Sequence, residues 1–127
     1  MAYEDGLWSL QVNPISLDSR FVSATRLFIN QDHASSASLL ESGDDSHIFR
    51  FLQLDVARQL MHAVARLKPS DSELMADWEE GTIGQVAQEM ASDALGTDLV
   101  TCIRLIDHDL VSFELMLQSA FRPWETT

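Results

Sequence analysis

Residues 111–118 form the pattern that most restricts the fold, because apolar side chains recur there at every second position. Val111, Phe113, Leu115 and Leu117 alternate with Ser112, Glu114, Met116 and Gln118. A period of two places successive side chains on opposite faces of a β-strand. We therefore predict a strand over Leu110–Gln118 that has one face in the core.

Three other segments also favour strands. Leu99–Ile106 is apolar and is joined to the alternating segment by Asp107-His108-Asp109, which predicts a β-hairpin. Leu7–Val12 is a short strand that ends at Asn13-Pro14, because proline lacks the donor that a ladder needs. His47–Leu54 is largely apolar on both faces, which predicts a strand that is covered on both sides.

The segment 18–30 fits two structures. Its β-branched and aromatic residues favour a strand. The spacing of Phe21, Ala24, Leu27 and Phe28 also fits one face of a helix that Asp18 or Ser19 caps. We favour the strand, and the helix stays open as the alternative.

Helices are predicted between residues 55 and 95. Asp55 caps a helix that runs to Leu67. Ser70 and Glu73 have the spacing of a capping box, which predicts a short second helix. Thr82 and Gln85 repeat that spacing before a third helix over Ile83–Leu95. Gly96 ends the third helix, since glycine readily adopts the left-handed conformation.

Together these elements predict a single α+β domain over residues 1–127. It contains an antiparallel sheet of four or five strands with two to three helices packed on one face. A chain of 127 residues can bury a core of its own without metals or disulfides. We expect residues 1–6 and 120–127 to be frayed unless Trp124 packs on the body, and residues 30–46 to form a long polar loop.

The charge is distributed unevenly. The formal net charge is −12, and no lysine or arginine lies between Lys68 and Arg104. Residues 1–68 hold 8 acidic and 6 basic residues, whereas residues 69–127 hold 12 acidic and 2 basic residues. This distribution disfavours direct binding of nucleic acid or of an anionic membrane, both of which attract Lys and Arg. It permits a basic partner or a surface that imitates nucleic acid, and the alternative is an acidic surface that only keeps the protein soluble.

The chain contains one cysteine, Cys102, so it cannot form an intrachain disulfide. Its apolar runs are shorter than the roughly 20 residues of a membrane-spanning helix, and its start does not resemble a signal peptide. We therefore expect a cytoplasmic protein.

No motif for catalysis, a cofactor or a metal is apparent. The pairs Asp32-His33 and Asp107-His108 are local turn residues, whereas a metal needs several converging ligands. Gly81-Thr82-Ile83-Gly84 is not a phosphate-binding loop, and Glu79 and Glu80 precede it. We expect no catalytic, cofactor-binding or metal-binding residue, and the pattern favours a non-catalytic protein over an enzyme.

The function expected from these features is a small protein-interaction module that binds a basic protein surface. Inhibitors, immunity proteins, secretion chaperones and nucleic-acid mimics share this size and charge. A homodimer formed through the paired strands at the end of the chain is also consistent with the pattern. The expected partner-binding residues are Asp77, Glu79, Glu80, Asp93 and Asp98.

The alternative is a small enzyme or a small-ligand-binding protein with a pocket between the sheet and the helices. Phe49, Phe51 and Trp78 would line that pocket. One of His47, His62 and His108 would supply its polar group.

Overall fold

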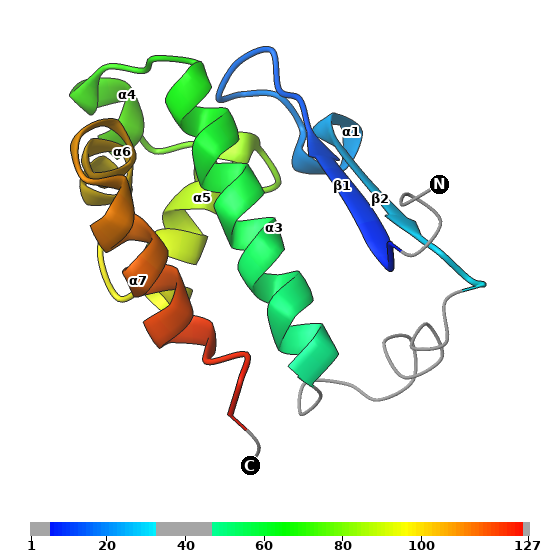
Figure 1. The fold of residues 1–127 in the computed structure, drawn as a ribbon. Coiled ribbons are helices and arrows are strands. Elements are labelled where there is room, and N and C mark those ends of the chain that lie inside the picture. The colour runs from blue at the N-terminus through cyan, green and yellow to red at the C-terminus, as the bar shows by residue number, and fades with distance from the viewer. Residues whose placement is uncertain (1–5, 33–46, 126–127) are drawn as a thin grey trace.

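The structure is a computed structural model that describes residues 6–32 and 47–125. Figure 1 shows a two-stranded sheet and a short helix on one side of a long helix, with most of the remaining helices on the other side. Within the described residues the elements are six α-helices, one π-helical turn and one antiparallel sheet of two strands. The prediction of a four- or five-stranded α+β sheet is therefore wrong, and the described part is mainly helical.

The sheet pairs β1 (Trp8–Val12) with β2 (Thr25–Ile29). Its register places Trp8 opposite Ile29 and Val12 opposite Thr25. The strand predicted over Leu7–Val12 is confirmed. The segment 18–30 contains both predicted alternatives in succession, since the short helix α1 (Phe21–Ala24) leads directly into β2.

The long helix α3 (His47–Arg66) replaces the strand predicted over His47–Leu54. A run that is apolar on both faces suits a buried helix as well as a buried strand, and Ile48 is the only β-branched residue in it. The helix predicted from Asp55 is therefore the second half of α3. Asp55 lies inside α3 rather than at its N-cap.

The capping signals are confirmed where the chain turns into α4 (Asp71–Met75) and α5 (Ile83–Glu89). The Ser70 hydroxyl accepts from the Glu73 backbone N–H, and the Glu73 carboxylate accepts from the Ser70 backbone N–H. The Thr82 hydroxyl accepts from the Gln85 N–H.

The third predicted helix continues from α5 into a π-helical turn, η3 (Met90–Ala94). The Leu95 N–H donates to the Met90 carbonyl, which is the wider ring of a π-turn. Gly96 follows with φ +66°, the left-handed conformation predicted for it.

The predicted C-terminal β-hairpin is a pair of helices, α6 (Leu99–His108) and α7 (Leu110–Phe121). Each begins at an aspartate: Asp98 accepts from the Thr101 N–H and Asp109 from the Ser112 N–H. Because α7 runs to Phe121, the expected strand edge for a homodimer is not present in these residues.

The burial within α7 explains why the alternating pattern was misleading. Phe113 and Leu117 are completely buried and lie four residues apart, on one side of a helix. Val111 and Leu115 belong to the same alternating set but are 71% and 59% exposed. The buried residues thus follow a helical period.

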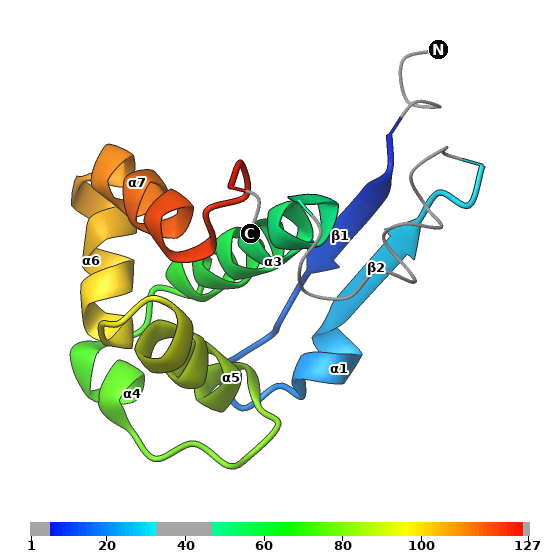
Figure 2. The same cartoon turned by 90° about the horizontal axis from the view of Figure 1, so that it is seen from below.

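The core is built around α3. This helix contacts β1 on one side and α5, α6 and α7 on the other (Figure 2). Its innermost residues, each 0% exposed, are Ala57, Leu60, Met61 and Val64. In the described part of the chain, no helix has both the length and the apolar character needed to cross a membrane.

The predicted short helix α4 is held against α5 by Trp78, whose indole covers Gly84. An ideal Cβ at Gly84 would lie 2.6 Å from two ring carbons of Trp78. The indole Nε1–H donates to the Glu73 carbonyl at 2.7 Å, which fixes the ring in place. Glycine at position 84 is therefore required by close packing.

Gly84→Ala is expected to destabilise the protein by about 1–2 kcal/mol, because overpacking outweighs the better helix propensity of alanine. Urea unfolding measures the change. In a Trp78→Leu background the same substitution should be neutral or stabilising. An equal loss in both backgrounds would show that the contact with the indole is not the cause.

Candidate functional site

The acidic segment between Lys68 and Arg104 lies on the surface. All eight of its carboxylate residues are exposed, as expected for charges that burial would desolvate. One of them, Asp71, forms an ion pair, with Arg104 at 2.7 Å. Three others, Asp77, Glu79 and Glu80, lie in the connection between α4 and α5.

The backbone of this connection is held by hydrogen bonds to other elements. The Glu80 carbonyl accepts from the Arg20 guanidinium at 2.8 Å, and the Gly81 carbonyl accepts from the Phe21 N–H at 2.9 Å. The Glu79 carbonyl accepts from the Thr82 hydroxyl at 2.7 Å. Within residues 6–32 and 47–125, no hydrogen bond or ion pair reaches the carboxylates of Asp77, Glu79 and Glu80. The held backbone therefore presents three carboxylates to solvent.

The start of α5 cannot serve as an anion site. The N–H groups of Ile83 and Gly84 donate to the carbonyls of Ser19 and Leu17, each at 2.8 Å. These donors would otherwise be free to bind a phosphate. The geometry therefore agrees with the prediction that Gly81–Gly84 is not a phosphate-binding loop.

Asp93 and Asp98 form a second acidic group. They are separated from Glu80 by α5 and η3, which together span about 15–18 Å of helix. Asp98 caps α6, and the hydrogen bond from the Thr101 N–H lowers the pKa of its carboxyl. The five predicted partner-binding residues therefore lie in two groups, and one of them has a structural role.

A groove of about 730 Å³ lies between β1, the first half of α3 and the segment after α7. Its lining includes Trp8, Phe51 and Trp124. Phe51 is 47% exposed and Trp124 is 55% exposed, so both rings are accessible at the surface. The groove is thus open and aromatic.

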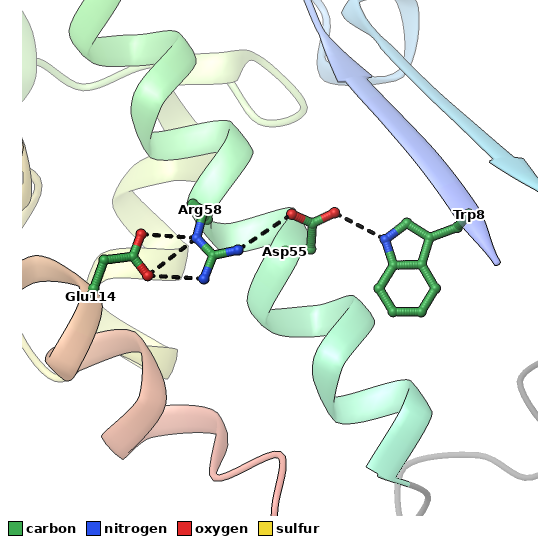
Figure 3. Close-up of polar contacts among 4 residues, drawn as sticks. All are labelled: Trp8, Asp55, Arg58 and Glu114. Carbon is green, nitrogen blue, oxygen red and sulfur yellow. Dashed lines mark hydrogen bonds and ion pairs between the residues drawn. The ribbon is translucent and has the colours of Figure 1, made fainter. Parts of the chain in front are cut away.

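A row of polar contacts runs from Trp8 through Asp55 and Arg58 to Glu114 (Figure 3), and the first three of these residues line the groove. The Trp8 indole Nε1–H donates to Asp55 Oδ2 at 2.9 Å, and the Arg58 guanidinium lies 3.7 Å from Asp55 Oδ1. Arg58 also donates from Nε and Nη2 to the Glu114 carboxylate, with the shortest distances at 2.9 Å. This hydrogen bond to Glu114 raises the pKa of Arg58, although burial opposes it.

The residues proposed for the alternative pocket do not line one cavity. Phe51 lines the groove, whereas Phe49 lies in a separate hollow with Met90 and Phe121. Trp78 covers Gly84. His62 packs edge-on against Phe113, with ring centroids 5.6 Å apart.

The remaining predictions about chemistry concern Cys102 and metals. Cys102 is buried in α6 rather than in a strand, and burial raises the pKa of its thiol to about 12. Such a thiol is a poor nucleophile. Among residues 6–32 and 47–125, no group of three or more His, Cys, Asp or Glu side chains could hold a metal ion. His33 of the Asp32-His33 pair lies outside the described residues.

The chain matches no protein-family model, and no curated protein or solved structure is significantly similar to it.

Sequence reasoning missed the groove and its polar row. Asp55 was predicted as a helix cap, and nothing in the local pattern links it to Trp8, which lies 47 positions away. The signal that was present is a charged pair, Asp55 and Arg58, in a segment with an apolar stripe. Charges beside a core stripe are often paired across elements.

The Arg58–Glu114 pair is expected to contribute about 1 kcal/mol to stability, because it is bidentate and its side chains are only 37% and 30% exposed. A double-mutant cycle of Arg58→Met and Glu114→Gln measures this coupling. The Arg104–Asp71 pair is 65% and 58% exposed and provides the matched control, with a coupling near zero. Equal coupling energies for the two pairs would refute the expectation that the less exposed pair contributes more to stability.

His62 is expected to make stability depend on pH. Burial is the main cause that lowers its pKa; Arg66 and Arg58 add to this, and Glu114 opposes it. The unfolded chain therefore binds the proton more tightly, and acidification favours unfolding. The contribution of neutral His62 to the free energy of unfolding is fully present above the ordinary pKa of 6.5. It is lost as the pH falls toward the lowered pKa of His62 in the folded state.

Unfolding free energies measured between about pH 8 and pH 5 should therefore decline less in His62→Gln than in the original chain. Parallel slopes for the original chain and His62→Gln would contradict the assignment.

Proposed function

We propose that this protein is a non-catalytic interaction module that binds a basic surface of a partner protein. The observation that carries the proposal is the connection between α4 and α5, in which Asp77, Glu79 and Glu80 are exposed on a backbone held from α1 and α5. Three carboxylates on a fixed segment lose little conformational freedom when a partner pairs with them.

Electrostatics supports the same partner chemistry. The Arg20 guanidinium donates to the Glu80 carbonyl, and no lysine or arginine lies between Lys68 and Arg104. With a net charge of −12, the chain attracts cationic surfaces and repels nucleic acid and anionic lipid. Complementary charge of this kind mainly accelerates association.

A partner that covers α5 would reach both acidic groups. The first group is Asp77, Glu79 and Glu80, and the second is Asp93 and Asp98. We assign the stronger role to the first group, because Asp98 already caps α6. The inhibitor, immunity, chaperone and nucleic-acid-mimic classes are all compatible with this contact, and we propose that it operates in the cytoplasm.

Reversing two charges together, Glu79→Lys with Glu80→Lys, should slow association with the partner about tenfold or more at low salt. Tagged protein is used to capture partners from lysate of its source at low and high salt, and association rates are then measured with the purified partner. The expected partner is basic, is lost at high salt, and is lost from the double variant.

Asp107→Lys is the matched control, since Asp107 is exposed at the end of α6, outside both acidic groups. It should retain the partner. Capture that is equal for all three proteins, or that is insensitive to salt, would reject the acidic surface as the binding site.

The second candidate function is small-ligand binding, and the groove at Trp8, Phe51 and Trp124 favours it. Its volume of about 730 Å³ is in the range of ligand sites. The groove and the acidic interaction surface use different residues, so small-ligand binding and partner binding are compatible with each other.

A further inference from the structure

Two residues of the groove lining, Asp55 and Arg58, belong to a row of charged side chains with a negative balance of charge. Asp55 and Glu114 contribute two carboxylates, and Arg58 contributes one cation between them (Figure 3). Both carboxylates are partly exposed, at 22% for Asp55 and 30% for Glu114. The row of Asp55, Arg58 and Glu114 therefore carries a formal charge of −1, and Asp55 and Arg58 are its members in the groove lining.

Arg58 is poorly placed to attract an anion into the groove. Its Nε and Nη2 donate to Glu114, and its Nη1 faces Asp55. An anionic ligand would compete with two carboxylates for a guanidinium that they already neutralise.

Asp55 retains capacity to accept a hydrogen bond. Its Oδ2 accepts from the Trp8 indole at 2.9 Å, but its Oδ1 lies 3.7 Å from Arg58, which is longer than a hydrogen bond. An ionised carboxylate has about four lone-pair sites, so a donor from a ligand can be accommodated. A cationic donor would also restore the charge balance.

Aromatic residues surround this acceptor. Trp8, Phe51 and Trp124 line the groove together with Asp55. Arg50 donates to the Glu125 carbonyl at 2.8 Å, which holds the segment that carries Trp124. Aromatic faces attract cations, and they also bury an apolar body.

The polar lining is too sparse for an extended peptide. The lining contains the side chains of Asp55, Arg58 and Gln118 as its polar groups, and Arg58 is already paired. A peptide backbone brings a donor and an acceptor with each residue, and these need partners when they are buried. A ligand with one cationic donor and an apolar body makes fewer demands.

We propose that this groove binds a small organic cation: a primary ammonium on an alkyl or aryl body, with the ammonium on Asp55 and the body against Trp8, Phe51 and Trp124. The inference rests on the second candidate function, small-ligand binding, and is independent of the proposed interaction module. The groove shares no residue with the acidic groups at Asp77–Glu80 and Asp93–Asp98.

The test follows the three indole N–H signals by ¹⁵N–¹H correlation NMR during titration with hexylammonium, hexanol and hexanoate. These probes have the same chain length and differ in charge. Hexylammonium should shift the signals of Trp8 and Trp124, which line the groove, and leave that of Trp78, which covers Gly84 and does not line it. Hexanol and hexanoate should bind at least about tenfold more weakly.

Asp55→Asn should weaken hexylammonium binding about tenfold or more, because it removes the charge while an amide oxygen can still accept from Trp8. Asp107→Asn removes one charge elsewhere and should have no effect. Phe51→Ala and Trp124→Ala truncate exposed rings and should also weaken binding, which keeps the test decisive if Asp55→Asn does not fold.

Three results would overturn the proposal. The first is equal binding of hexanol or hexanoate, which would indicate a merely apolar groove or an anion site. The second is the absence of shifts at Trp8 and Trp124. The third is a response to an arginine-containing peptide but not to hexylammonium, which would indicate a protein-docking groove. None of these results would affect the charge-reversal test at Glu79 and Glu80.

Discussion

Burial of one face of α3 is the interaction on which the rest of the structure depends. Leu60, Met61 and Val64 are completely buried, and a fully buried side chain of this kind contributes about 1.5–3 kcal/mol. Ala57 lies on the same face and allows neighbouring elements to approach closely. The sheet packs on one side of α3, and α5, α6 and α7 pack on the other, so α3 joins the sheet to the helices.

The solvent side of the same helix organises the groove. Asp55 and Arg58 connect α3 to β1 through Trp8 and to α7 through Glu114. The contacts that fix β1 and α7 therefore also position Asp55 in the groove. Packing and the proposed ligand chemistry share Trp8 and Asp55, so substitutions there need a stability measurement beside a binding measurement.

The features that the sequence predicted correctly are local. The side chains of Ser70 and Thr82 accept hydrogen bonds from backbone N–H groups three residues later, and Gly96 adopts the left-handed conformation directly after the helix. Such interactions depend on spacing alone. The exposure of the acidic residues was also predictable, because burying an unpaired carboxylate is costly. The groove was not, since Trp8, Phe51 and Trp124 come together only after β1, α3 and the end of the chain have packed.

The sequence by itself determined where α4 and α5 are capped, that Gly96 follows the third predicted helix in the left-handed conformation, and that the second half of the chain presents negative charge. Only the tertiary structure decided that the segments 47–54 and 99–118 are helices. Phe113 and Leu117 satisfy a period of two and also a separation of four, so the pattern is compatible with both conformations. The choice depends on burial: a helix satisfies its own backbone and places both residues against α3 and α6, whereas a strand needs neighbouring strands that the described chain does not offer.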